Sequence, residues 1–208
     1  MPGETISDEA VLEAVATETG WMEDLLVRLV EAPTTLGEEE AGQRIMEQAF
    51  ADCGLEPQSV YLDAEALRSA EGASPFSWDV RGKRNVVAGW PALGSGGRSL
   101  ILNGHVDVVP PAAEALWTNP PFRAVREGDW LYGRGAGDMK AGLATTATTD
   151  ARHFVRLGIP AVCFGPRGEG IHGIDERVSL RSVVESAQVL GLFVRDWCGL
   201  VPGRKEES

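Results

Sequence analysis

Apolar side chains recur at helical spacing along three stretches of this 208-residue chain. Three helices are therefore expected, over residues 8–32, 38–53 and 179–198. Ser7 or Asp8 can cap the first helix, Gly20 is expected to interrupt it, and Pro33 stops it. The apolar stripe of the last helix consists of Val183, Val184, Ala187, Leu190, Leu192 and Phe193.

Short apolar runs between these helices predict strands. Runs at 100–103 and 161–164 are expected to be buried on both faces of a sheet, and shorter strands are expected at 58–62 and 85–89. Residues 63–76 form an insertion without a clear pattern. The alternation predicts an α/β fold, a layered domain with a mostly parallel central sheet flanked by helices. A chain of this length is expected to form a single domain over 1–208.

A histidine stands where the first buried strand is expected to end. His105 follows Asn103-Gly104, and ligands of open α/β sheets collect at the carboxyl ends of strands. Asp107 lies two residues on, so in extended backbone both side chains share one face. The carboxylate can then take one ring N–H and leave the other ring nitrogen to a metal. The alternative is a histidine that satisfies a turn or lies in the core.

A glycine-rich run places a carboxylate before a predicted helix start. Asp138 follows Gly133, Gly135 and Gly137, a spacing that lets the backbone bend tightly round a ligand. An ordinary helix N-cap is the alternative for Asp138. A phosphate loop is disfavoured, because the run lacks the Gly-Lys-Ser/Thr ending and places an acid against the phosphate.

A second histidine follows the second expected strand and another set of glycines, at His172. Imidazoles and carboxylates are zinc ligands, and catalytic zinc typically keeps three protein ligands with one position open to water. His105, Asp138 and His172 meet that count. The alternative is a structural domain in which these three side chains satisfy turns.

Charge and cysteine content narrow the classes of partner. The net charge of −12 argues against nucleic acid and against an anionic membrane surface. Three cysteines without metal-motif spacing indicate reduced thiols, and the acidic amino terminus carries no apolar leader segment. We therefore expect a cytoplasmic protein that binds no nucleic acid and no membrane.

Taken in order, these motifs resemble the zinc-dependent amidohydrolase and peptidase family that includes acetylornithine deacetylase, succinyl-diaminopimelate desuccinylase, aminoacylase and carboxypeptidase G. The resemblance covers nearly the whole chain, and the tail to Leu200 is most similar to the acetylornithine deacetylase-like branch. The segments that carry it are Pro33-Thr34, Gly37-Glu38, residues 104–110, Trp117, Pro121-Phe122, residues 133–140, residues 148–152, residues 164–166 and residues 172–176.

The resemblance implies metal-dependent hydrolysis of the amide bond in N-acyl amino acids or peptides. It implies that His105 binds one zinc ion, that Asp138 bridges two, that His172 binds the second, and that Asp107 orients His105. Cobalt or manganese is an alternative metal. Thr148 and Arg152 resemble a loop that contacts the substrate, with a buried Asp150–Arg152 ion pair as the alternative.

The chain also departs from the family. Between Gly142 and Thr148 family members carry a long middle portion with a Glu-Glu pair, a further carboxylate ligand and a lid domain that often dimerises. The part to 144 is thus expected to join directly to the part from 145, through a single crossover helix between Met139 and Leu157. Dimerisation through the lid is excluded, and one metal ion or fewer is expected.

The missing portion includes the family's general base. Residues 38–40 are an acidic run, but a solvated first helical turn explains them. Glu169 and Glu176 flank His172 and are alternatives as bases, with a surface loop carboxylate as the ordinary role of each. Two functions follow: an amidohydrolase impaired by its shortening, or an inactive remnant that binds metal or a partner without catalysis.

Overall fold

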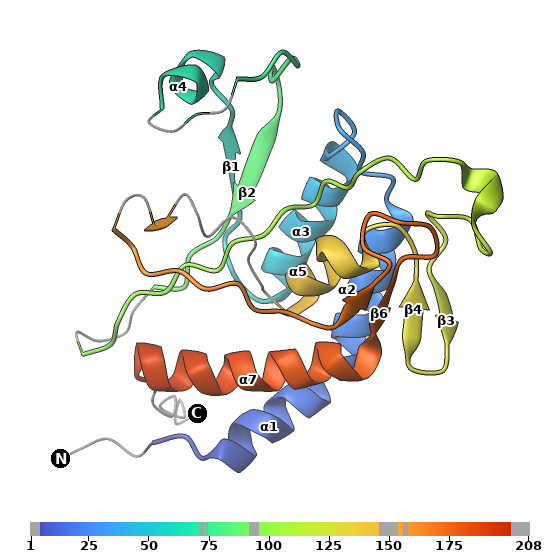
Figure 1. Cartoon of the computed structure of the whole chain (residues 1–208). Coiled ribbons are helices and arrows are strands. Elements are labelled where there is room, and N and C mark those ends of the chain that lie inside the picture. Colours follow the sequence, from blue (N-terminus) through green and yellow to red (C-terminus); the bar gives the residue numbers. More distant parts are fainter. Residues whose placement is uncertain are drawn as a thin grey trace.

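The computed structural model describes residues 5–70, 73, 75–91, 96–145, 154–155 and 158–200, and shows a mixed arrangement of helices and small sheets (Figure 1). The helices are α1 (Asp8–Thr17), α2 (Thr19–Glu31), α3 (Glu40–Asp52), α4 (Ala64–Ser69), α5 (Ala141–Thr145) and α7 (Leu180–Cys198). A short 3-10 helix, η1 (Glu114–Leu116), and an irregular turn, η2 (Ala136–Lys140), are also present.

The three predicted helices are present, the first of them divided into α1 and α2, and side chains cap the starts of α1 and α7. The Ser7 hydroxyl accepts a hydrogen bond from the Ala10 amide at 3.2 Å and so caps α1. The chain breaks between α1 and α2 at Glu18 rather than at Gly20. The Ser179 hydroxyl caps α7 in the same way, and Gly199 ends that helix with a positive φ of 72°.

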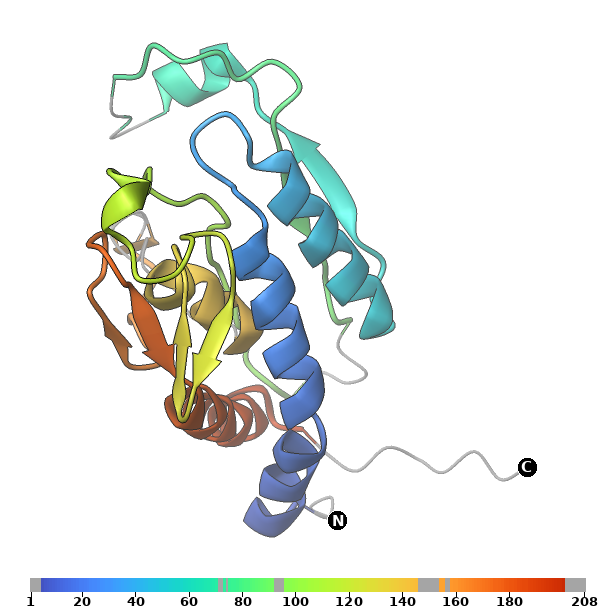
Figure 2. The ribbon, with the colours of Figure 1, turned by 90° about the vertical axis from the view of Figure 1, so that its right-hand side faces the viewer.

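The strands form two separate antiparallel sheets. Strands β1 (Gln58–Tyr61) and β2 (Arg84–Val87) pair with each other, and together with α4 they project from the body of the molecule (Figures 1 and 2). The second sheet has the order β3-β4-β6-β5. Its strands are β3 (Val125–Glu127), β4 (Trp130–Tyr132), β5 (Gly168–Glu169) and β6 (Arg177–Ser179).

The expected mostly parallel central sheet is not found among the described residues. The one parallel contact there is an isolated bridge between Thr35 and Val108. The predicted strands at 100–103 and 161–164 do not form regular strands, and Ile101 and Val162 are 62% and 75% exposed. The apolar runs predicted burial on both faces of a sheet, but these side chains are largely exposed.

Helix α2 organises the core, because both of its faces are covered. Leu25 and Leu29 contact α3 residues and Val106 in one buried cluster. Leu26 and Val30 belong to a second cluster, which joins α2 to β4, β6, α5 and α7. Figure 2 shows α2 running between α3 on one side and the four-stranded sheet on the other. These two clusters fix the positions of α3, of the β4–β6 strand pair and of α5 relative to α2.

Helix α7 is covered along part of its length by α1, as Figure 1 shows. A side chain at Gly191 would lie 3.0 Å from Val11, so the glycine permits this close approach. Of the expected α7 stripe, Val183 is fully buried and the remaining members are half-buried or exposed. None of the described helices combines the length and apolar character needed to cross a membrane.

Candidate metal centre

The segment that carries His105 is anchored against the end of α2. The Val108 amide donates to the Thr34 carbonyl at 2.9 Å, and the buried Thr34 hydroxyl donates to the Val106 carbonyl at 2.5 Å. Val106 and Val108 are both buried. Because side chains alternate in extended backbone, the two residues between and before these valines, His105 and Asp107, face the other way.

His105 and Asp107 are in contact through the Nδ1 side of the ring. The Nδ1 atom lies 3.3 Å from Asp107 Oδ1 and 3.0 Å from the Asp107 carbonyl oxygen. On the other side of the ring, Nε2 lies 3.5 Å from Asp138 Oδ1. The carboxylates of Asp107 and Asp138 raise the pKa of His105 to about 10. The ring is thus held from one side, with Nε2 directed at Asp138.

The glycine-rich run before Asp138 is bent by close packing. Gly133 has a φ of 152° and a side chain there would meet Val30 at 2.3 Å; Gly135 has a φ of 81° and a side chain there would meet Val108 at 2.3 Å. Only glycine fits both positions without displacing the core. The run delivers Asp138 into the irregular turn η2, directly before α5.

Asp138 lies between the two histidines, with one oxygen directed at each. Its Oδ2 is 2.9 Å from His172 Nε2, and its Oδ1 is 3.5 Å from His105 Nε2. Two ligand atoms of one tetrahedral zinc ion, each about 2.0–2.1 Å from the metal, lie about 3.3 Å apart. The 3.5 Å separation on the His105 side is close to that value, and the 2.9 Å separation on the His172 side is that of a direct hydrogen bond. The hydrogen bonds to His105 and His172 hold the pKa of Asp138 below its usual range.

His172 reaches Asp138 from a loop with unusual backbone. His172 and Asp175 have positive φ values of 61° and 55°, which few non-glycine residues adopt. The Asp175 carboxylate accepts hydrogen bonds from the Thr118 amide at 2.9 Å and the Thr118 hydroxyl at 2.8 Å. The His172 loop is therefore tied to the η1 region as well as to the Asp138 turn.

Glu176 is not the surface loop carboxylate that its sequence context suggested. It is completely buried, and its two oxygens accept hydrogen bonds from Arg134 and from three backbone amides of the Asp138 loop. The glycine-rich run does bend round an anion, and that anion is the side chain of Glu176. A carboxylate whose oxygens are already occupied by donors is unsuited to take a proton from water.

Glu169, the other alternative base, is also engaged. Its carboxylate accepts from Arg167 at 2.5 Å and from Arg177 at 2.7 Å. Hydrogen bonds from Arg177 and Arg167 lower the pKa of Glu169. A lowered pKa makes this carboxylate a weaker base, so neither glutamate beside His172 is arranged for general base catalysis.

Lys140 is a completely buried cation that was not predicted as a site residue. Its Nζ donates to the Ala32 carbonyl at 2.8 Å, and burial lowers its pKa to about 8. The contact ties the turn that follows Asp138 to the end of α2. A lysine one turn after a glycine run is ordinarily exposed, so only the packing reveals it.

The donor chemistry at Asp138 fits a divalent metal, but the ligand set is incomplete. Each side of the carboxylate offers one imidazole nitrogen and one carboxylate oxygen, the donors that zinc takes. Across the described ranges, no group of three or more histidine, cysteine, aspartate or glutamate side chains is arranged to hold an ion. The expected substrate contacts Thr148 and Arg152 lie outside the described residues.

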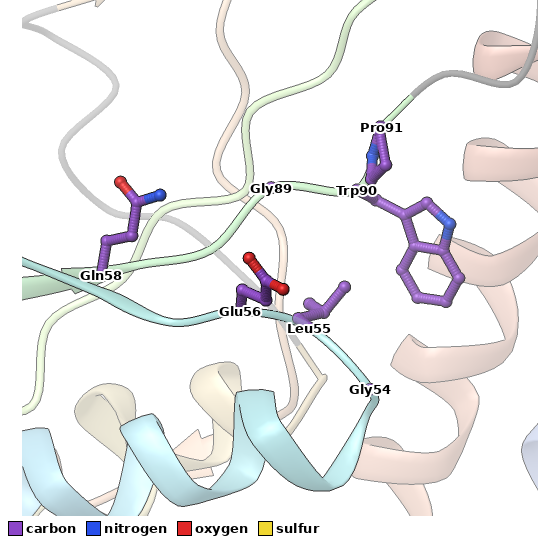
Figure 3. Close-up of a pocket in the computed structure, with 7 residues that line it drawn as sticks. All are labelled: Gly54, Leu55, Glu56, Gln58, Gly89, Trp90 and Pro91. Carbon is purple, nitrogen blue, oxygen red and sulfur yellow. The ribbon is translucent and has the colours of Figure 1, made fainter.

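A separate groove lies at the base of the β1–β2 arm (Figure 3). Its lining is Gly54, Leu55, Glu56, Gln58, Gly89, Trp90 and Pro91. Trp90 is 77% exposed, and the lining contains neither histidine of the metal centre. We assign it no role in the chemistry at Asp138.

Comparison with known protein families gives a match to Peptidase family M20/M25/M40 in two segments, residues 101–149 and 144–196. The first segment contains His105, Asp107 and Asp138, and the second contains His172. The two segments meet at 144–149, where the sequence analysis expected a middle portion of the family to be missing.

Similar curated proteins include succinyl-diaminopimelate desuccinylases. The enzyme of Dinoroseobacter shibae is 48% identical over 91 residues, which are 44% of this chain and 24% of that protein. The enzyme of Alkalilimnicola ehrlichii is 36% identical over 139 residues, which are 62% of this chain and 35% of that protein. The chain thus spans about a quarter to a third of the length of these relatives.

Among solved structures, the dipeptidase Dug1p of Saccharomyces cerevisiae superimposes with a TM-score of 0.50 at 16% sequence identity, over 67% of this chain and 29% of that one. This likeness concerns the fold alone. The two matched segments and the desuccinylase relatives agree with each other: residues 101–196 of the chain are similar to peptidase family M20/M25/M40.

Proposed function

We propose that this chain carries part of the metal centre of an amidohydrolase that acts on N-acyl amino acids or small peptides. The observation that carries the proposal is the placement of Asp138, whose two oxygens face the Nε2 atoms of His105 and His172. Desuccinylase relatives and the family match support amide hydrolysis as the reaction class.

Each residue has a distinct part in this proposal. His105 and His172 would each contribute to a position for a divalent metal, zinc in the first instance, and the Asp138 carboxylate would be shared between the two positions. Asp107 takes the Nδ1 side of His105 and leaves Nε2 to the metal. A bound ion would supply Lewis-acid polarisation of the amide carbonyl and activation of water. Thr148 and Arg152 remain the proposed substrate contacts.

The chain as given is proposed to hydrolyse amides poorly. General acid–base help is typically worth about 10² to 10⁴ in rate, and the two glutamates beside His172 are bound to arginines. Each metal position also lacks a third ligand within the described residues. Metal binding without catalysis is therefore the second candidate function, favoured by the same engaged carboxylates.

We further propose a cytoplasmic location and a single catalytic-type domain over residues 1–208. Cys53 and Cys198 are free thiols, which supports a reducing compartment. The proposed partner is the small substrate.

The test is amide hydrolysis of N-succinyl-diaminopimelate and N-acetylornithine by the purified, zinc-loaded chain, beside a His172→Ala control. We expect turnover well below about one per second in both. Turnover at or above that rate that disappears in the control would contradict the impairment and show that another carboxylate of the chain acts as the base. Turnover that persists in the control would show that the reaction does not use this centre.

A further inference from the structure

We propose that Arg134 and Glu176 are a positioning pair that holds the two ligand-bearing loops of the metal centre in register. The inference rests on the proposed function, because it concerns how Asp138 and His172 are kept at metal-binding distance. Neither residue is proposed to touch metal or substrate.

Glu176 organises the loop that carries Asp138. Its Oε2 accepts from Arg134 Nη1 at 2.5 Å and from the Gly135 amide at 3.1 Å. Its Oε1 accepts from the Gly137 amide at 2.9 Å and from the Asp138 amide at 3.0 Å. One carboxylate from the His172 side of the molecule therefore fixes the backbone of the Asp138 loop, including the amide of the ligand itself.

Arg134, which belongs to the Asp138 loop, in turn contacts the backbone of the His172 loop. Its Nη2 donates to the Gly173 carbonyl at 2.8 Å and lies 3.5 Å from the His172 carbonyl oxygen. Its guanidinium lies 5.0 Å from the centre of the Trp117 ring, within the range of a cation–π contact. A side chain from the Asp138 loop thus holds the backbone of the His172 loop.

The reciprocity follows from the sheet register. Strands β4 and β6 pair antiparallel with Tyr132 opposite Arg177, and the Gly133 amide donates to the Glu176 carbonyl at 2.9 Å. Arg134 lies just beyond the end of β4 and Glu176 just before the start of β6, so the ladder brings them to the same end of the strand pair. The Arg134–Glu176 ion pair therefore connects the two segments just beyond the last paired residues of β4 and β6.

The Arg134–Glu176 ion pair is buried, so both charges need their partners to be present. Each side chain is 1% exposed, and the Arg134 Nε has no hydrogen-bond partner. In such surroundings each charge depends on the other and on the loop groups that it contacts. A change at either residue therefore leaves donors or acceptors unmatched in both loops at once, and Asp138 and His172 lose their fixed separation.

The first variant is Glu176→Gln in the full chain. Its amide group places a donor against either the Arg134 guanidinium or the loop amides, all of which are donors themselves. We expect zinc affinity, measured by competition with a chromophoric chelator, to fall by roughly 10-fold to 100-fold. In the metal-free chain, the imidazole nitrogen and ring-proton NMR signals of both His105 and His172 should move.

Two controls separate positioning from general destabilisation. Val183→Ala removes volume from the core beneath α7 and changes no residue of either loop, and it should lower thermal stability while leaving zinc affinity and the imidazole signals unchanged. Glu169→Gln changes a half-buried glutamate of β5 that is also bound to arginines, and it should change neither readout. Arg134→Lys keeps the charge but loses the fork, and it replaces Glu176→Gln if that variant does not fold.

The outcomes are distinguishable. If the parent chain binds zinc no better than Asp138→Ala, the proposed function fails, and the imidazole signals alone then decide the positioning role. If the parent binds zinc and Glu176→Gln binds it equally with unchanged imidazole signals, the positioning role is overturned while the metal centre stands. Loss of affinity in Val183→Ala to the same degree would also overturn it, because stability alone would then explain the effect.

Discussion

The loops that carry Asp138 and His172 are held by hydrogen bonds from buried side chains, whereas the predicted strands at 100–103 and 161–164 are largely exposed. In the loops, the Glu176 carboxylate accepts four hydrogen bonds, and Arg134 reaches two carbonyl oxygens. In the segments at 100–103 and 161–164, apolar side chains that were expected in the core are exposed, among them Ile101 and Val162.

The contrast shows which part of the centre depends on local pairing. The β4–β6 ladder needs only two short segments, and both are present, so the loops at its end are fully formed. The segments at 100–103 and 161–164 form no regular strand. The chain therefore keeps Asp138 between two histidines, while the segment that leads to His105 belongs to no regular sheet among the described residues.

The largest expected effect tests the contrast through stability. Glu176→Ala should lower the free energy of unfolding by about 3–5 kcal/mol, because it leaves the buried Arg134 charge uncompensated. Ile101→Ser should change it by no more than about 0.5 kcal/mol, because that side chain is already exposed. Urea unfolding of the full chain measures both. Equal effects of the two substitutions would remove the distinction between the regions.

The next effect concerns metal affinity on the His105 side. His105→Ala should weaken zinc binding by more than about 100-fold, beyond the roughly 10-fold to 100-fold expected for Asp107→Asn as an orienting partner. Chelator competition supplies the numbers, with Glu47→Gln on α3 as a control remote from the centre. Unchanged affinity in both variants would show that no metal site exists there.

A smaller effect is expected at the glycine run. Gly135→Ala should cost about 1–3 kcal/mol, since a left-handed residue gains a side chain that meets Val108 at 2.3 Å. The matched control is Gly20→Ala in α2, which has open space and should stabilise the chain by about 0.5–1 kcal/mol. Thermal unfolding of the pair should move in opposite directions. A neutral Gly135→Ala would mean that the loop is looser than described.

The smallest expected effect on stability concerns the hydrogen bond that anchors residues 106–108, which follow His105. Thr34→Val removes the hydroxyl that donates to Val106 and should cost about 0.5–1.5 kcal/mol. Thr17→Val removes an exposed helix hydroxyl bonded to Glu13 and should have little effect. Chemical denaturation distinguishes them. A loss confined to Thr17→Val would contradict the anchoring of 106–108.

Much of the helical structure was predictable, because its signals are local. Ser7 and Ser179 cap α1 and α7 as their positions indicate, and apolar periodicity placed α2 and α3 within two residues. Helix α4 was missed, although Asp63 caps it by accepting from the Glu65 and Ala66 amides. Six residues are too few for periodicity to reveal.

Strand pairing and the burial of Glu176 could not be predicted from local sequence patterns. The run at 100–103 has strand composition, but composition does not say whether a neighbour exists to pair with it. The motif residues identified Asp138 and its two histidines, which the structure brings together. The burial of Glu176 could not be read from a glycine-rich loop; the nearest signal was an arginine within the facing glycine run, at Arg134.

The central claim is that Asp138 is a carboxylate shared by two histidines at a metal centre. The most direct test is the zinc content and affinity of the full chain after gel filtration, compared with Asp138→Ala. The account predicts roughly one weakly held ion per chain in the parent and loss of most binding in the variant. Two equivalents retained by the parent, or equal binding by parent and Asp138→Ala, would contradict it.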